Sequence, residues 1–239
     1  MRWYQTWWGV ALLGLGGLVF AGAVIFGITT VKFWWQIKQG QGNFLQQQVY
    51  SGFDRSIKDN QGEQVDRKVL EAGDFPFLGN PNASTTIVVF GDFRCPNTKN
   101  AMPIIKQLAA KYGYKLKVIF RNFPGESIHP GATRLAQIGV CAYSQGRYWQ
   151  ASDYLFAKKD DLPVYLASGD IAALAGATGL NLDKLNKCID SSAAVIKVNR
   201  DYADGYRFGV GGTPTFFING QKIEGVVPFD AWEKFIKQL

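Results

Sequence analysis

The chain has 239 residues, of which 47% are hydrophobic, so it is long enough to bury a substantial core and does not have a disordered composition. Its 26 Lys and Arg residues against 19 Asp and Glu residues give a formal net charge of +7 at pH 7. These basic residues are scattered among acidic ones, without a dense basic run or an interleaved aromatic motif, so we expect no nucleic-acid partner.

The N-terminal part contains 29 consecutive uncharged residues, from Trp3 to Val31. As a helix this segment would be about 44 Å long, more than the roughly 30 Å of a bilayer's hydrocarbon core. Aromatic side chains flank both ends, as in the belts at membrane interfaces: Trp3, Tyr4, Trp7 and Trp8, then Phe33, Trp34 and Trp35.

A cleaved signal peptide is the alternative interpretation, because Ala21-Gly22-Ala23 has the small-x-small form of a cleavage site. The apolar run continues for eight residues beyond Ala23, however, so we expect residues 1–35 to be an uncleaved single-pass anchor with its flanks. The charges on the two sides of this segment do not decide its orientation.

Residues 36–75 are rich in Gln, Gly, Lys and Asp, which predicts a polar tether or juxtamembrane helix between the anchor and the folded domain. Turn-forming residues cluster in "EAGDFPFLGNPNAS", residues 71–84, and we expect the domain to span residues 76–239.

The domain opens with a β-α-β pattern. Residues 85–90, "TTIVVF", form a short apolar run typical of a strand buried on both faces. Apolar residues at helical spacing follow Cys95 and end at Gly113, and residues 115–123 predict the next strand. Two strands joined by a helix in this way are expected to be parallel.

A helical region follows, with one helix or two over 130–156 and further helices over 170–180, 181–191 and 193–208. Residues 213–218 then predict a strand, Asn219-Gly220 a tight hairpin turn, and residues 221–226 an antiparallel strand. Pro228 opens a closing helix. The predicted class is α/β, with a helical insertion between the β-α-β unit and a final β-β-α unit.

Four segments in order resemble the DsbA-like branch of the thioredoxin superfamily: "GNPNASTTIVVFGDFRCP", "FPGESIHPGATRLAQIGVCA", "GGTPTFFING" and "FDAWEKFI". The resemblance covers residues 76–239. It implies a thioredoxin fold with a helical insertion domain at about 128–208, thiol-disulfide oxidoreductase activity and no cofactor. It also implies that Pro214, after Thr213, is a cis-proline opposite the active-site sulfur, where the Thr213 backbone could bind an extended substrate.

Cys95 is the candidate nucleophile, because it lies where a strand leads into a helix. The free N–H groups and dipole of a helix N-terminus stabilise a thiolate, which is the reactive form of the side chain. Pro96 directly after it favours the reactive interpretation, because Cys-Pro is how a thiol-disulfide active site begins. Arg94 and Lys99 would add to this effect if they face the sulfur. The alternative is a buried, inert cysteine.

Thr98 stands where the resembled family has the second cysteine of Cys-x-x-Cys. A hydroxyl cannot form a disulfide, but it can donate a hydrogen bond to the Cys95 thiolate. The site could therefore attack a disulfide but could not release the product without an external thiol. This departure argues against action as a stand-alone oxidase.

Two polar residues near this motif have open roles. Asp92 could tune the thiol or relay protons, and it could equally be an exposed loop carboxylate or a helix cap. His129 is the only histidine. We expect it to start a helix or to pack rather than to pair with Cys95. No Cys/His cluster has zinc-ligand spacing, so we expect no metal.

Cys141 and Cys188 lie in the predicted insertion, where similar family members often carry a paired cysteine. The resemblance therefore implies a structural disulfide between them and leaves Cys95 free, although either could instead be a separate thiol or exchange with Cys95. A disulfide would place the domain on the extracytoplasmic side of the membrane.

We expect a membrane-anchored oxidoreductase that uses one cysteine to reduce, isomerise or deglutathionylate disulfides, with protein or small-molecule thiols and disulfides as partners. The alternative is a thioredoxin-fold module that binds extended peptides, or scaffolds a membrane assembly, without turnover.

Overall fold

The computed structural model describes residues 7–38, 64–164 and 166–238, so Trp3, Tyr4 and residues 39–63 of the predicted tether lie outside the described residues. The chain divides into two compact units, residues 1–51 and 52–239. In the first unit, helix α1 (Trp7–Lys38) is long and apolar enough to cross a membrane. Its window Leu15–Lys32 has a mean hydropathy of 1.8 and is not buried.

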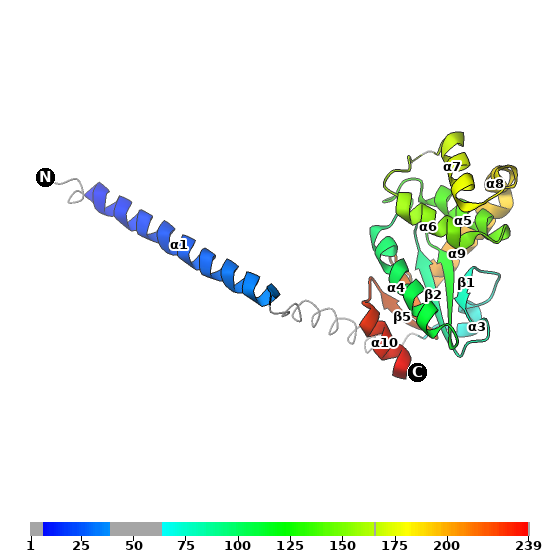
Figure 1. Ribbon diagram of the computed structural model, residues 1–239, viewed down its shortest axis with the longest axis horizontal. Helices are drawn as coiled ribbons and strands as arrows, with labels where there is room; N and C mark the ends of the chain where they lie inside the picture. The colour runs from blue at the N-terminus through cyan, green and yellow to red at the C-terminus, as the bar shows by residue number, and fades with distance from the viewer. Residues whose placement is uncertain (1–6, 39–63, 165, 239) are drawn as a thin grey trace. The chain divides into compact units, whose positions relative to one another are not determined.

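The second unit is built on a five-stranded sheet in the order β1-β3-β2-β4-β5 (Figure 1). Its strands are β1 (Phe77–Gly79), β2 (Thr85–Gly91), β3 (Leu116–Asn122), β4 (Thr215–Ile218) and β5 (Gln221–Glu224). Helix α4 (Pro96–Tyr112) joins β2 to β3, which are parallel, whereas the other neighbouring pairs are antiparallel. The predicted α/β class and parallel pair are confirmed, and β1 is a strand that the sequence reading missed.

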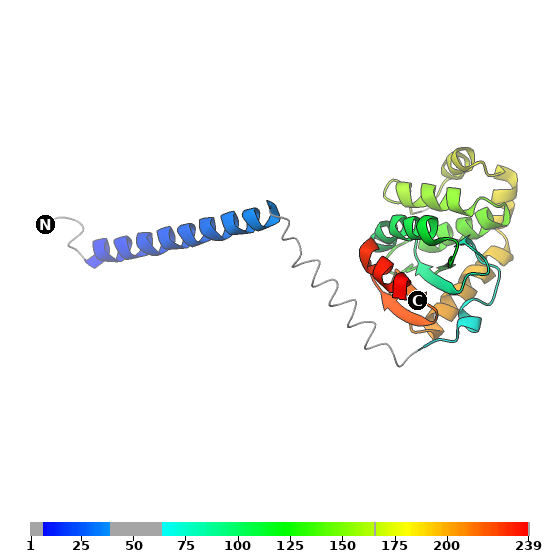
Figure 2. The same cartoon turned by 60° about the horizontal axis from the view of Figure 1, so that its bottom comes forward.

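In the part of the chain that the structure describes, five helices lie between β3 and β4: α5 (Ala132–Ser144), α6 (Tyr148–Lys158), α7 (Ser168–Thr178), α8 (Leu182–Ile189) and α9 (Ser192–Arg207). Helix α5 contacts α6, α8 and α9, and α9 contacts β3. Helices α5–α8 gather at one end of the domain and α10 (Phe229–Gln238) lies at the other (Figures 1 and 2). Residues 130–156 form two helices because Gly146, with φ of 70°, ends the first.

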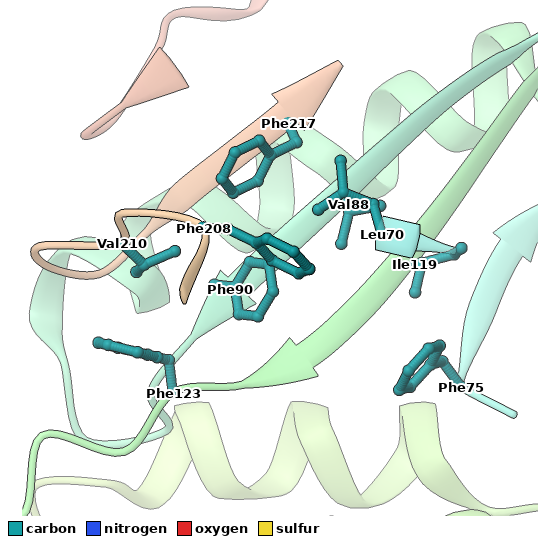
Figure 3. Packing of buried hydrophobic residues seen from close by; sticks show 9 residues of the cluster. All are labelled: Leu70, Phe75, Val88, Phe90, Ile119, Phe123, Phe208, Val210 and Phe217. Atoms are coloured by element: carbon teal, nitrogen blue, oxygen red, sulfur yellow. The ribbon is translucent and has the colours of Figure 1, made fainter. Parts of the chain in front are cut away.

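One face of the sheet is covered by aromatic and aliphatic side chains. The register places Val88 of β2 beside Ile119 of β3 and Phe217 of β4. Phe90 makes edge contacts with the rings of Phe123, Phe208 and Phe217, at 5.8–6.4 Å between ring centroids. The buried cluster is drawn in Figure 3: Leu70, Phe75, Val88, Phe90, Ile119, Phe123, Phe208, Val210 and Phe217.

The opposite face of the sheet packs against α4 and α10. Val89 pairs in register with Phe120 and Phe216, which alternate with the residues of the first face. The ring of Phe216 meets Trp232 of α10 edge-on at 5.1 Å. Because β2 is buried on both faces, its residues 87–90 are all apolar rather than alternating with polar ones.

The domain begins earlier in the chain than residue 76, the boundary predicted from composition. The Val65 N–H donates to the Gly220 carbonyl at 3.0 Å, and the short helix α3 (Arg67–Leu70) follows with Asp66 as its N-cap. Leu70 and Phe75 are buried in the cluster of Figure 3. The residues around Leu70 and Phe75 are mostly polar, so the sequence showed no apolar pattern that would predict their burial.

A buried ion network joins the insertion to the sheet. The Arg121 side chain in β3 is fully buried, and its Nε donates to Asp201 of α9 at 3.2 Å, while its Nη2 donates to Asp204. The Asn122 N–H also donates to Asp201, at 3.1 Å. Because a buried charge is costly unless it is paired, this network fixes α9 against β3.

Candidate active site

Cys95 lies in the turn between β2 and α4. Its N–H donates to the Asp92 carbonyl at 3.1 Å, and its own carbonyl accepts from the Lys99 N–H at 3.1 Å in the first turn of α4. With Pro96 as the first helical residue, Cys95 is the N-cap, in an extended conformation with φ of −70° and ψ of 124°. The sulfur therefore stands at the positive end of a 17-residue helix.

The loop before β4 lies against this sulfur. The peptide bond between Thr213 and Pro214 is cis, and the Cys95 S–H donates to the Thr213 carbonyl at 3.1 Å. These segments meet because β4 pairs antiparallel with β2, which brings Thr215 beside Phe90. The fold thus assembles the site from residues that are more than a hundred positions apart.

The exposure of Cys95 is small, since only 5% of its surface is accessible. In this respect it matches the alternative of a buried cysteine. Its sulfur lies against the loop of Thr213 and Pro214, 3.1 Å from the Thr213 carbonyl.

Thr98 is fully buried beneath the turn. Its Oγ1 accepts a hydrogen bond from the Asp92 N–H at 3.5 Å, and its methyl group packs toward Gly91. A Cβ at Gly91 would lie 2.9 Å from this methyl group and 2.6 Å from the Phe120 ring, so the site requires glycine there. A hydrogen bond from Thr98 to the Cys95 thiolate stays a prediction.

The two cations next to Cys95 in sequence are engaged elsewhere. Arg94 donates to the carbonyls of Leu162 at 3.2 Å and Pro163 at 2.5 Å, beyond the end of α6. Lys99 pairs with Asp160 at 3.2 Å. The side chains that would add positive charge if they faced the sulfur instead connect the active-site segment to the insertion.

Asp92 is neither an exposed loop residue nor a helix cap, because it is 2% exposed and its Oδ2 lies 2.7 Å from Nδ1 of His129. His129 was expected to start a helix or to pack, and the His129 carbonyl does accept from the Ala132 N–H at 3.0 Å. The contact of His129 with Asp92 was not predicted, since nothing in a spacing of 37 positions indicates that two side chains meet.

The two other cysteines form a disulfide that joins α5 to α8. Cys141 and Cys188 have Cα atoms 5.7 Å apart, and Cys95 is the free cysteine. The pairing is the one that the resemblance implied. In this state, Cys95 has no bonded sulfur partner.

Comparison with known proteins places these features in a family. The family model described as "Thioredoxin" matches residues 71–238. The chain belongs to the thioredoxin family. Its solved neighbours show that the fold is of the DsbA-like type, with a thioredoxin core and a helical part.

Two of these neighbours resemble the chain over most of their length. The thiol-disulfide exchange protein alpha-DsbA2 from Wolbachia pipientis has a TM-score of 0.61 at 21% identity, covering 79% of this chain and 96% of that chain. Oxidised BdbD from Bacillus subtilis has a TM-score of 0.59 at 24% identity, covering 69% of this chain and 91% of that chain. At such identities the likeness establishes the fold.

One relative matched by sequence is named as an ion antiporter. The chain is 33% identical over 155 residues to the Na(+)/H(+) antiporter NhaA 1 of Mycolicibacterium gilvum (strain PYR-GCK), over 64% of this chain and 24% of the antiporter. The match thus spans about a quarter of that relative's length.

Proposed function

We propose that this protein is a membrane-anchored, extracytoplasmic thiol-disulfide oxidoreductase that acts through Cys95 alone. The observation that carries the proposal is the position of the Cys95 sulfur, at the start of α4 and 3.1 Å from the Thr213 carbonyl beside a cis-proline. Membership of the thioredoxin family supports it, as does a structural neighbour described as a thiol-disulfide exchange protein.

The chemistry has two exchange steps. The Cys95 thiolate attacks one sulfur of a substrate disulfide, so that a mixed disulfide forms and the other sulfur leaves as a thiolate that takes up a proton. Because Thr98 cannot attack this product, an external thiol must do so, which restores Cys95 and carries the bound half away as a new disulfide. The net reaction exchanges one thiol of a disulfide for another, as in deglutathionylation. Isomerisation results when the attacking thiol belongs to the substrate, and net reduction requires a second external thiol that cleaves the new disulfide.

The substrate would bind along the cis-proline loop. In forming the mixed disulfide, the sulfur gives up its proton, and with it the hydrogen bond to the Thr213 carbonyl. That carbonyl then becomes an acceptor for a backbone N–H of an extended substrate. Thr213 and Pro214 are therefore proposed as substrate-binding residues, and Pro96 as the residue that sets the start of α4 behind the nucleophile.

Trapping of the mixed disulfide tests the function. The full-length chain in detergent micelles, incubated with glutathione disulfide or with a protein that has an exposed disulfide, should gain one adduct at Cys95, detected by mass spectrometry. Cys95→Ser should remove the adduct, while Cys141→Ala/Cys188→Ala should keep it. No adduct on the wild-type chain at neutral pH would refute the proposal.

The anchor and its orientation form a separate part of the proposal. The exposed apolar surface of α1 supports membrane insertion, and the Cys141–Cys188 disulfide supports an oxidising compartment. Protease added to intact cells should digest the domain, and N-terminal sequencing should recover the uncleaved chain. A protected domain would contradict the orientation, and a new N-terminus after Ala23 would contradict the anchor.

A peptide-binding module without turnover is the second candidate, favoured by the low exposure of Cys95 and by a groove beside its helix. The groove has a volume of about 310 Å³ and is lined by residues of α4 and α6: Lys99, Met102, Pro103, Lys106, Asp153, Phe156 and Ala157. Under this hypothesis Cys95→Ser would bind extended peptides as tightly as the wild type, as measured by calorimetry. Loss of binding in that variant would exclude it.

A further inference from the structure

The Asp92 side chain connects the active-site turn to the loop that leads into the insertion. Its Oδ1 accepts from the Arg94 N–H at 2.8 Å, within the turn. Its Oδ2 accepts from the Gly125 N–H at 3.0 Å and lies 2.7 Å from Nδ1 of His129, both in the loop after β3. A carboxylate that is 2% exposed is tolerated only when hydrogen bonds satisfy it, so these contacts hold the two segments together.

The backbone of Asp92 contacts the two residues at the centre of the site. Its carbonyl accepts from the Cys95 N–H at 3.1 Å, and its N–H donates to Thr98 Oγ1 at 3.5 Å. A shift of Asp92 would therefore displace the nucleophile and the residue beneath it. The carboxylate also belongs to the residue three positions before a sulfur that must become negative in order to react.

His129 is the partner of Asp92 whose charge can change. Its side chain is 22% exposed, so a proton from solvent can reach the ring. Histidine is the side chain that ordinarily titrates between about pH 5 and pH 8. Neutral, the ring donates one hydrogen bond through Nδ1 and leaves the Asp92 charge uncompensated; protonated, it forms an ion pair with Asp92.

We propose that Asp92 is a positioning residue for Cys95, and that His129, acting through Asp92, makes the reactivity of the Cys95 thiol depend on pH. The inference rests on the proposed function in that it takes Cys95 as the nucleophile. When His129 is protonated, it neutralises the carboxylate and removes a charge that opposes the thiolate. The Cys95 reaction rate therefore falls less steeply on acidification than the rate of a simple thiol.

Other charged groups on the segments around the pair include Arg94, Lys99, Glu126, Lys159 and Asp160. Arg94 is held by carbonyls beyond α6, and Asp160 is paired with Lys159 and Lys99. Burial acts to raise the pKa of Glu126, but hydrogen bonds from the N–H groups of Gly131 and Thr133 outweigh it and lower the pKa. Side chains of these types ordinarily keep their charge between about pH 5 and pH 8.

Alkylation of Cys95 by iodoacetamide tests the proposal, because Cys95 is the free cysteine and the reagent is uncharged. Rates are measured by mass spectrometry on the full-length chain in micelles, from about pH 5 to pH 9. In wild type the alkylation rate should fall only gradually with pH in the range where histidine gains its proton. We expect the rate of His129→Gln to fall steeply there, so that this variant reacts about three- to tenfold more slowly than wild type near pH 6. Superimposable profiles would overturn the proposal.

Two further variants separate positioning from general damage to the loop. Glu126→Gln alters a carboxylate of the same loop that binds the start of α5 rather than Asp92, and it should leave the profile unchanged. An equal effect in Glu126→Gln would overturn the role of the pair. In Asp92→Asn the Cys95 alkylation rate should also fall steeply on acidification. If its pH dependence matched that of wild type, the action of His129 through Asp92 would be contradicted.

His129→Gln carries the test alone if Asp92→Asn does not fold, because His129 is partly exposed. The alkylation rate reports on the thiol whether or not disulfides are exchanged. If the chain formed no mixed disulfide, but its alkylation rate still depended on His129, the proposed function would be refuted. The role of Asp92 and His129 in the reactivity of the Cys95 thiol would stand.

Discussion

The active-site turn and the helical insertion both hold cysteines, in different surroundings. Cys95 ends a turn beyond the carboxyl ends of the parallel strands β2 and β3, beside the loop before β4. Its sulfur contacts the Thr213 carbonyl. Cys141 and Cys188 face each other between α5 and α8 and are bonded. The comparison teaches that the end of the sheet leaves a free sulfur beside a backbone carbonyl, whereas the helices use sulfur as a covalent connection.

The largest change to this comparison would come from a second sulfur in the site. Thr98→Cys restores Cys-x-x-Cys spacing at the start of α4, and the buried thiol would take the place of the hydroxyl. We expect oxidation with diamide to close a disulfide between Cys95 and the introduced cysteine, so that a thiol titration finds no free thiol where wild type keeps one. Thr98→Ser, the matched control, should keep it. A reactive thiol that persists in Thr98→Cys would contradict the geometry.

Removal of the disulfide should affect the stability of the insertion and spare the chemistry. Cys141→Ala/Cys188→Ala opens a loop of 47 residues and should lower the free energy of unfolding by about 4 kcal/mol on the chain-entropy argument. Urea denaturation followed by circular dichroism measures the loss. Under native conditions the Cys95 alkylation rate should equal that of wild type, and a large change in that rate would show that the two regions are coupled.

The next largest loss of stability is expected at the ion pair between Arg121 of the sheet and Asp201 of the insertion. Asp201→Ala leaves the fully buried Arg121 with Asp204 as its remaining charged partner, and the expected loss in the free energy of unfolding is about 3 kcal/mol. Asp204→Ala is the control and should cost less, because the Asp204 side chain is 25% exposed. A larger loss in Asp204→Ala would reverse the assignment of the main partner.

The smallest effect is expected at the far end of α4, where Glu233 of α10 contacts Lys111 and Tyr112. Hydrogen bonds from Lys111 and then Tyr112 lower the pKa of Glu233 to about 2 from 4.5. A lowered pKa means that the carboxylate stabilises the fold above about pH 4.5 and ceases to do so as the pH falls toward about 2.

Glu233→Gln should therefore unfold at a slightly lower temperature than wild type at pH 7, and the difference should vanish as the pH falls through this range. Melting curves between pH 2 and pH 7 measure it. A difference that stays constant with pH would mean that packing, not charge, accounts for the loss.

Local patterns in the sequence were enough for most of the fold. The apolar run before Cys95 predicted β2, and Asn219-Gly220 predicted the hairpin of β4 and β5, where both turn residues have positive φ. Residues 64–75 escaped prediction because Leu70 and Phe75 stand in a polar segment without periodicity. Strand β1, at three residues, is too short to show a pattern.

The candidate site divides in the same way. Cys95, Pro96 and Thr98 form one local motif, which a strand-to-helix pattern reveals. Asp92 was open to several roles, and its partner His129 is 37 positions away, so that only folding shows the contact. The sequence left open whether Arg94 and Lys99 face the sulfur, and the structure shows that their side chains bind the segment after α6.

The sequence by itself determined what is local: an apolar helix long enough to span a bilayer, most strands and helices of the domain, and a lone cysteine at a helix start. Only the tertiary structure decided what faces that cysteine, because β2, β4 and the loop after β3 come together through strand pairing and burial over long separations. Hydrophobic periodicity records which side of an element is buried. It does not record which buried groups meet.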